Sequence, residues 1–193
     1  MRVETNLPTT LSVGPKLLLK PNDAPTEVVE NISTEKFLSP PWVLPDNHFK
    51  EIYAPYVINR VLDPRPILEE LYRVARNGCL LELTVPHGAA DSAWESPYFV
   101  RPYFPNSFLH FQRPLMKIKE AYDWQCKACY IRVPESLLAQ MPEQAHLQTV
   151  MIQRNVAEEI CVVMEAIKPG RKEDDPDKIR LPKMLVQGMK GHV

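Results

Sequence analysis

Glycine is scarce in this 193-residue chain, which contains only 6, whereas proline is abundant at 20. This balance argues against a glycine-rich nucleotide loop, because such loops need backbone dihedrals that glycine adopts easily and proline does not. Net charge is also nearly absent, at -1, so no overall field attracts nucleic acid or anionic lipid. No apolar run approaches the ~20 residues of a membrane span, and residues 1–6 lack the apolar core of a signal peptide. We expect a protein without a membrane or nucleic-acid partner, in the cytoplasm or in a particle assembled inside the cell.

Cysteine is also sparse, and its spacing does not favour a metal site. Only Cys126 and Cys129 are close in sequence, whereas a zinc site usually needs two such pairs or additional histidines. Both fall in a predicted strand at 126–133, where positions three apart face opposite sides. We therefore expect buried, reduced thiols and no bound metal.

The clearest pattern in the chain is a strand–helix–strand unit. A short apolar run at 49–53 predicts a buried strand. Asp63 before a proline has the form of a helix N-cap, and Gly78 is typical of a C-cap, so a helix is expected between them. A second strand is predicted at 79–85, and a crossover of this length implies two parallel strands. The apolar residues expected to be buried in this unit are Ile52, Ile67, Leu68, Leu71, Leu81, Leu83 and Val85.

The N-terminal quarter is harder to interpret because breakers interrupt it. Residues 1–15 have no helical period and predict an extended arm. The apolar run at 16–20 suits a short strand. Beyond it, the spacing fits either a strand at 26–31 or a single helix at 26–37, and both alternatives stay open.

The C-terminal part predicts a short helix at 134–141 and a final buried strand around 160–164. Residues 170–193 then lose core-forming periodicity, so we divide the chain into the arm, a domain at 16–169 and this tail. Ordering such a tail costs ~1–2 kcal/mol per residue in backbone entropy, which contacts with another chain would offset. The tail residues that we expect to contact another chain, in a homo-oligomer or a larger assembly, are Leu181, Met184, Leu185, Val186 and Met189.

Several motifs of the central unit resemble class I S-adenosylmethionine-dependent methyltransferases of the type 11-like branch. They are Leu-Pro-Asp-Asn at 44–47, Phe-Lys-Glu-Ile-Tyr-Ala at 49–54, Tyr-Arg-Val-Ala-Arg-Asn-Gly at 72–78 and Ser-Pro-Tyr-Phe-Val-Arg-Pro-Tyr at 96–103. The resemblance covers residues 16–169. It implies an α/β fold with a Rossmann-like, mostly parallel sheet and flanking helices, abbreviated in its N-terminal half.

The chain departs from this family where the family binds its cofactor. In place of the glycine-rich loop it has Lys-Pro-Asn-Asp at 20–23, which is wrong in shape, donors and charge for a sulfonium cofactor. In place of a segment like His-Val-Leu-Glu-His it has Tyr-Val-Ile-Asn-Arg at 56–60. These departures predict a domain that has lost catalysis, uses no cofactor and serves as a structural or interaction module, for example in a virus particle.

The alternative is an active methyltransferase of unknown substrate with an unusual cofactor loop. In that case the resemblance implies S-adenosylmethionine as cofactor. The residues that would then line its site are Glu30, Asp46 and His87.

Overall fold

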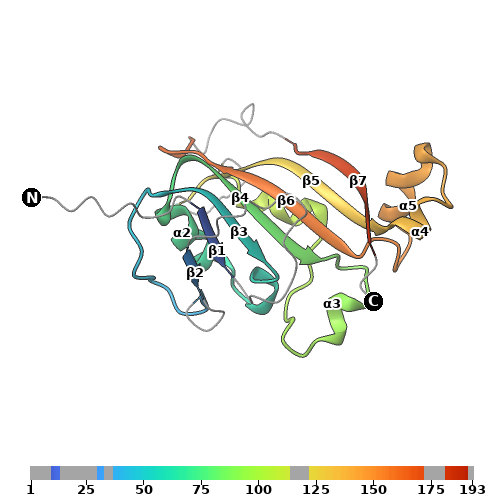
Figure 1. Cartoon of the computed structure of the whole chain (residues 1–193), viewed down its shortest axis with the longest axis horizontal. Helices are drawn as coiled ribbons and strands as arrows, with labels where there is room; N and C mark the ends of the chain where they lie inside the picture. Colours follow the sequence, from blue (N-terminus) through green and yellow to red (C-terminus); the bar gives the residue numbers. More distant parts are fainter. Residues whose placement is uncertain (1–9, 14–29, 33–36, 114–121, 172–180, 191–193) are drawn as a thin grey trace, which may run out of the picture.

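Seven strands form one open, mixed sheet in the order β2-β1-β3-β4-β6-β5-β7 (Figure 1). The structure is a computed structural model that describes residues 10–13, 30–32, 37–113, 122–171 and 181–190. The strands are β1 (Thr10–Val13), β2 (Glu30–Ile32), β3 (Phe49–Pro55), β4 (Ala75–Pro86), β5 (Trp124–Pro134), β6 (Glu159–Ala166) and β7 (Lys183–Met189).

The first four strands of this order are parallel, whereas β6 runs antiparallel to both β4 and β5, and β7 is parallel to β5. This arrangement confirms the predicted fold class, a Rossmann-like, mostly parallel sheet of the methyltransferase type with flanking helices. The helical elements are η1 (Ile58–Arg60), α2 (Arg65–Val74), α3 (Ser92–Glu95), η2 (Pro105–Phe111), α4 (Glu135–Leu138), η4 (Glu143–Ala145) and α5 (His146–Ile152). In the described residues, no helix is both long and apolar enough to cross a bilayer.

The main core lies between α2 and the central strands. All seven residues predicted to be buried in the strand–helix–strand unit are at most 3% exposed. Trp124 of β5 is fully buried in the same core, and its indole Nε1 donates a hydrogen bond of 3.1 Å to Leu68 O on α2. The periodicity of α2 therefore placed its buried face correctly.

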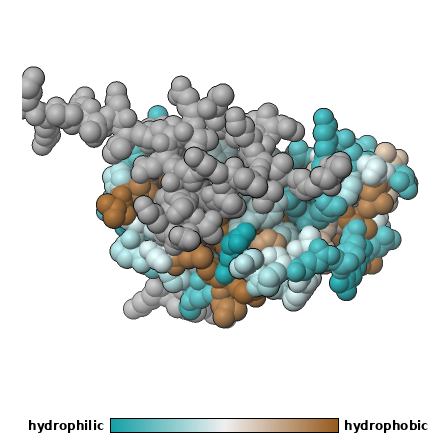
Figure 2. Space-filling model, turned by 60° about the horizontal axis from the view of Figure 1, so that its bottom comes forward, coloured by the Kyte–Doolittle hydropathy of each residue, from teal (hydrophilic) through white to brown (hydrophobic). Residues whose placement is uncertain are grey.

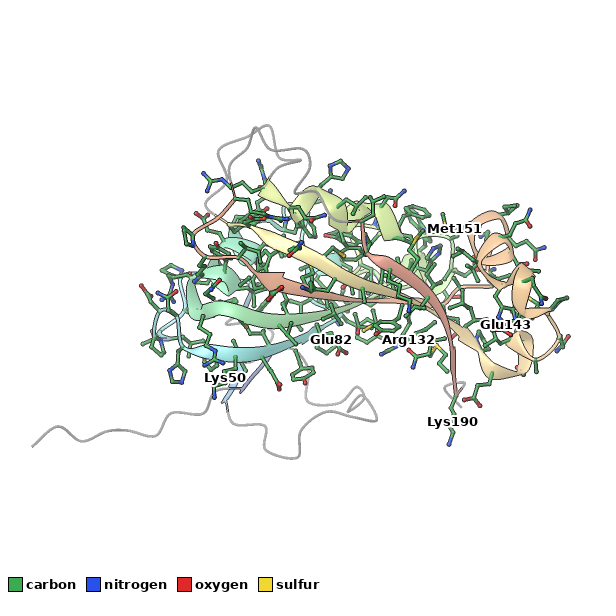
Figure 3. All side chains as sticks on the ribbon, turned by 90° about the horizontal axis from the view of Figure 1, so that it is seen from above. Lys50, Glu82, Arg132, Glu143, Met151 and Lys190 are labelled. Carbon is green, nitrogen blue, oxygen red and sulfur yellow. The ribbon has the colours of Figure 1, made fainter. Side chains whose placement is uncertain are left out.

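The two faces of the sheet differ because side chains alternate along each strand. Figure 3 shows Glu82 and Arg132 pointing to one side of the sheet, while Met151 of α5 lies on the other. A second cluster, on the α5 side, contains Ile131, Val150 and Val156. α5 thus sits on the apolar face of the sheet, near the end of the molecule where β4 stops.

The boundaries of the central helix differ from the prediction at both ends. Pro64 is the N-cap residue, while an oxygen of Asp63 accepts a hydrogen bond of 3.1 Å from Arg65 N. The helix ends at Val74, so Gly78 lies within β4, with a φ of +76°, and does not cap the helix. Strand pairing takes over early because Ala75 is already in register with β3.

Both chain ends differ from the prediction as well. The first strand in the described residues is β1, inside the segment assigned to the extended arm, and the predicted strand at 16–20 falls outside the described residues. Of the strand alternative for 26–31, Glu30 and Asn31 fall in β2, which the helix alternative does not allow, and residues 26–29 lie outside the described residues. In the tail, β7 pairs with β5 of the same chain, so 170–193 contributes to the sheet. Backbone pairing, which needs no apolar period, explains why this strand was missed.

The prediction of buried, reduced thiols agrees with the structure. All four cysteines are free and buried, and burial raises the pKa of each thiol to about 12. Within the described part of the chain, no group of three or more potential ligands gathers to hold a metal ion.

Candidate functional site

The order of the sheet reverses between β1 and β3, because the chain proceeds outward from β1 to β2 and then returns to the other side. In open α/β sheets, ligands bind outside the carboxyl ends of the strands at such a reversal. The described backbone that follows β3 there begins with Tyr56, which has a φ of +55° and donates from its N to Thr84 O at 2.7 Å. This turn leads directly into η1.

Asn59 and Arg60 of η1 stand where the methyltransferase family that the sequence resembles has Glu and His. The guanidinium of Arg60 stacks over Tyr98 and Phe99, with 6.0 and 5.4 Å to the ring centroids. Its Nε also donates to Tyr56 O at 2.9 Å. Arg60 is therefore engaged in holding the 96–103 segment.

The side chain of Asn59, unlike that of Arg60, makes no hydrogen bond. It is only 2% exposed, and neither Oδ1 nor Nδ2 of its amide has a hydrogen-bond partner. Its backbone O, in contrast, accepts from Val100 N and Arg101 N. A buried amide without partners costs roughly 1–3 kcal/mol, and such a group in a native structure calls for an explanation such as a bound water or ligand.

A cleft of about 480 Å³ opens beside the carboxyl end of β4. Its walls come from the residues after β4, from α3, from the start of η2 and from the end of α5. The residues that line it are His87, Gly88, Ala89, Trp94, Phe104, Pro105, Asn106, Val150, Met151, Ile152, Gln153 and Arg154.

His87 is the titratable group at the base of this cleft. It is 3% exposed, and burial lowers the pKa of its ring, so the imidazole is neutral at physiological pH. Ala89 N donates to its Nδ1 at 3.2 Å, which assigns the hydrogen of the neutral ring to Nε2. The ring of Phe104 meets it edge-on at a centroid distance of 5.4 Å. His87 can thus donate a hydrogen bond from Nε2, while its lone pair is already used.

Gly88 is required by the close approach of the next wall of the cleft. Its N donates to Tyr103 O at 2.7 Å. A Cβ at Gly88 would come within 2.6 Å of the Phe104 ring and 2.9 Å of Tyr103 O, distances that real side chains do not tolerate. The absence of a side chain at Gly88 therefore allows the Phe104 ring to pack directly against this backbone.

The mouth of the cleft is apolar and open to solvent. Trp94, Phe104, Met151 and Ile152 are 60, 47, 50 and 73% exposed. Figure 2 shows hydrophobic side chains reaching the surface at the end of the molecule that carries α4 and α5. Trp94 is held in place by a hydrogen bond of 3.0 Å from its Nε1 to Gly88 O. Exposed apolar groups around a hollow are typical of ligand or partner sites.

Charges at this mouth neutralise one another. Arg154, a lining residue, lies 2.5 Å from a carboxylate oxygen of Asp91, which also accepts from Asn155 Nδ2 at 2.7 Å. These hydrogen bonds, from Arg154 first, hold the pKa of Asp91 below its usual value. With His87 neutral, the described lining carries no uncompensated charge.

The structure does not bring the three sequence-predicted cofactor residues together. Glu30 is the first residue of β2, on the amino side of that strand. Asp46 precedes β3, whereas His87 follows β4. Because β3 and β4 are parallel, Asp46 and His87 lie at opposite ends of the sheet.

Asp46 belongs to a structural network at the amino end. Arg73 pairs with Asp46 and also donates to Glu70 Oε1 at 2.6 Å and to Trp42 O at 3.0 Å. Glu70 is only 6% exposed and accepts from Trp42 N at 2.7 Å. Burial alone would raise the pKa of Glu70, but the hydrogen bonds from Arg73 and Trp42 N hold it below its usual value.

The residues predicted to contact another chain lie on or beside β7. Leu181 is 76% exposed and Met184 is 37% exposed, whereas Leu185 and Val186 are half-buried, the latter against Ile131 and its neighbours. The described residues include no second chain, so the predicted oligomer stays a prediction.

Comparison with known proteins gives solved structures but no sequence relatives. No protein-family model matches the chain, and no curated protein matches it. A SAM-dependent methyltransferase of Thermotoga maritima is similar at 16% identity and a TM-score of 0.43, covering 72% of this chain. SAM-dependent methyltransferases of Archaeoglobus fulgidus and Mesorhizobium loti are similar at 10 and 11% identity, with TM-scores of 0.45 and 0.46, covering 71 and 73% of this chain and 67 and 71% of their own. The chain spans 63% of the length of the Thermotoga protein.

These similar structures correct one prediction. The chain was expected to use no cofactor, because residues 20–23 lack a glycine-rich loop. The proteins with this fold that it matches are SAM-dependent, which points to the alternative, S-adenosylmethionine. Residues 20–23 lie outside the described part of the chain. The first described strand, β1, ends at Val13, and the predicted strand at 16–20 that precedes this loop also lies outside the described residues.

Sequence reasoning missed most of the cleft. Phe104, Trp94 and Met151 come from three separate elements, and nothing in their spacing indicates that they meet. His87, which the sequence analysis named as a candidate site residue, lines the cleft. Gly88 was a second available signal, because a chain with only 6 glycines places one directly after a strand-ending Pro86 and His87.

Proposed function

We propose that this domain binds S-adenosylmethionine outside the carboxyl ends of β1 and β3 and a second small molecule in the cleft beside His87. The observation that carries the proposal is the reversal of strand order between β1 and β3, with the cleft at the same edge of the sheet. The similar proteins are SAM-dependent, which makes this cofactor the first to test. Two adjacent sites suit transfer of the methyl group from the first ligand to the second.

The residues present fit a polar ligand at the reversal. The amide of Asn59 offers its nitrogen as a donor and its oxygen as an acceptor, both without partners, and the half-buried Tyr56 begins the turn there. When bound, S-adenosylmethionine supplies a methyl group on a sulfonium sulfur. The chain's own contribution is to hold the two ligands close to each other. The lone pair of His87 already accepts from Ala89 N, so this ring donates a hydrogen bond and does not act as a base. The proton that the accepting nucleophile loses therefore passes to solvent.

Isothermal titration with S-adenosylmethionine and with S-adenosylhomocysteine tests the proposal directly. We expect saturable binding of both, and a rise in melting temperature that follows their concentration. Replacing Asn59 by Leu removes the unpartnered amide and should weaken both ligands in parallel. An unchanged melting temperature at millimolar cofactor, with no heat of binding, contradicts the proposal.

A second candidate function is favoured by Arg60. In the resembling family the segment at 56–60 is rich in polar functional residues, but here Arg60 is stacked on Tyr98 and Phe99. A side chain recruited to packing supports a domain that has lost catalysis and serves as an interaction module in a homo-oligomer or a larger intracellular assembly, such as a virus particle. Cofactor binding without formation of S-adenosylhomocysteine, together with a particle larger than 22.2 kDa in light scattering, would favour this candidate.

A further inference from the structure

The cleft beside His87 has walls of a specific kind. Trp94, Phe104 and Met151 each line it and each keep about half or more of their surface exposed. Flat aromatic faces and a thioether attract an aromatic ring, through offset or edge contacts and through sulfur–ring contacts. Because Trp94 donates a hydrogen bond to Gly88 O and the Phe104 ring packs against Gly88, these walls are already in place before a ligand arrives.

The polar groups of the lining select the charge of the ligand. Arg154 is compensated by Asp91, and the remaining polar lining groups are neutral amides and the imidazole of His87. A charged ligand would lose hydration on entering without gaining a counter-ion. An uncharged ligand loses less, and a hydrogen-bond acceptor on it would meet the Nε2–H of His87.

We infer that this cleft binds a small uncharged aromatic molecule, whose ring lies between Trp94, Phe104 and Met151 and whose acceptor atom faces His87. The inference rests on the proposed role of the cleft as the second-ligand site and is independent of the cofactor site at β1 and β3. A volume of about 480 Å³ lies within the ~300–1,000 Å³ of small-molecule sites, so one or two rings fit.

Four probe compounds separate the chemical classes. Benzamide is uncharged, aromatic and carries a carbonyl acceptor. Benzoate and benzylammonium keep the ring but add a negative or a positive charge, and cyclohexanecarboxamide keeps the amide but removes the aromatic ring. The readout is the indole N–H signal of Trp94 in a nitrogen–proton correlation spectrum, which a Trp94→Phe variant assigns. The two other tryptophans, Trp42 and Trp124, are buried elsewhere and serve as internal controls.

We expect benzamide to shift the Trp94 signal saturably, and to bind at least tenfold more tightly than each of the other three probes. Met151→Ala should weaken the binding of benzamide severalfold. Leu147→Ala, on the same helix but outside the lining, should leave benzamide binding unchanged. His87→Phe keeps a ring of similar size without the donor. It should reduce the preference for benzamide over toluene, a further compound that has the aromatic ring but no acceptor. Equal binding of all four probes, tighter binding of a charged one, or no shift at all would overturn the inference.

The source of the ring needs its own comparison. N-acetyl-tyrosinamide carries an uncharged ring on a peptide backbone, as a protein partner would present it. Tenfold tighter binding of this compound than of benzamide would overturn the assignment to a small molecule. Failure of S-adenosylmethionine to bind, with benzamide still shifting Trp94, would overturn the cofactor proposal and leave this inference standing.

Discussion

At the amino end of the parallel strands the buried carboxylate of Glu70 is paired, whereas at the carboxyl end the buried amide of Asn59 has no partner. Arg73 joins Asp46, Glu70 and the backbone of Trp42 in one network before β3. After β3, the side-chain amide of Asn59 is as buried as the carboxylate of Glu70 but has no hydrogen bond. The sequence pointed to Asp46 as a site residue and treated the segment at 56–60 as a loss of function. The structure instead places Asp46 in a satisfied network and leaves the unsatisfied buried amide at Asn59, a kind of group that calls for an explanation such as a bound water or ligand.

The largest effect that we expect is at the amino end. Glu70→Ala should lower the free energy of unfolding by about 3–5 kcal/mol, because it leaves the Arg73 guanidinium and the Trp42 N–H without their buried acceptor. Urea unfolding of the variant and of Glu69→Ala, an exposed neighbour on the same helix, measures the difference. A loss below about 1 kcal/mol would show that water replaces Glu70 and that the two ends do not differ.

The next largest expected effect is a pH-dependent change in stability that comes from Glu159, a buried carboxylate at the carboxyl end. Burial raises the pKa of Glu159 from its ordinary 4.5 to about 7, although Arg132 lies 3.3 Å away. The folded state therefore binds this proton more tightly than the unfolded state, so the stability that it contributes is lost as pH rises from about 4.5 to 7.

Glu159→Gln removes this dependence. At pH 5 the variant should match the parent, and at pH 8 it should be more stable by about 1–3 kcal/mol, since an ionised buried group is gone. Thermal unfolding across this range measures both values, with Glu165→Gln, a half-buried residue of the same strand, as control. A variant less stable than the parent at pH 8 would mean that the ion pair with Arg132 outweighs burial.

A smaller gain is expected at η1. Asn59→Leu replaces an amide without partners by an apolar side chain of similar size, and should raise the free energy of unfolding by about 1 kcal/mol. The same change should weaken the cofactor, so stability and binding move in opposite directions. Destabilisation by 1 kcal/mol or more, measured in urea, would mean that the amide is hydrogen-bonded in solution.

The smallest effect belongs to Asp46. Its side chain is 66% exposed, so its ion pair with Arg73 is screened by solvent. Asp46→Ala should cost about 0–1 kcal/mol and leave cofactor affinity unchanged, because the residue lies at the wrong end of the sheet. A marked loss of S-adenosylmethionine binding without loss of stability would return Asp46 to the site.

The elements that repeat a period were predictable, and those that depend on distant backbone were not. The buried face of α2 follows from apolar spacing alone, as Leu68 and Leu71 show. The pairing of Ala75 with Phe49 of β3, which ends that helix early, depends on a residue 26 positions away and leaves no local signal. The cleft is harder still, because Trp94, Phe104 and Met151 meet only after three separate elements are in place.

The position of β7 has a consequence for how the chain folds during synthesis. β5 is 11 residues long and has left the ribosome about 50 residues before the strand that covers its outer edge. At ~5–20 residues per second, translation leaves this edge unpaired for a time on the order of 3–10 s. An uncovered strand edge recruits other chains, so crowded nascent chains are most prone to associate in this interval. Slowing translation after residue 134 should therefore increase inclusion-body formation, and a chaperone that shields extended segments should reduce it.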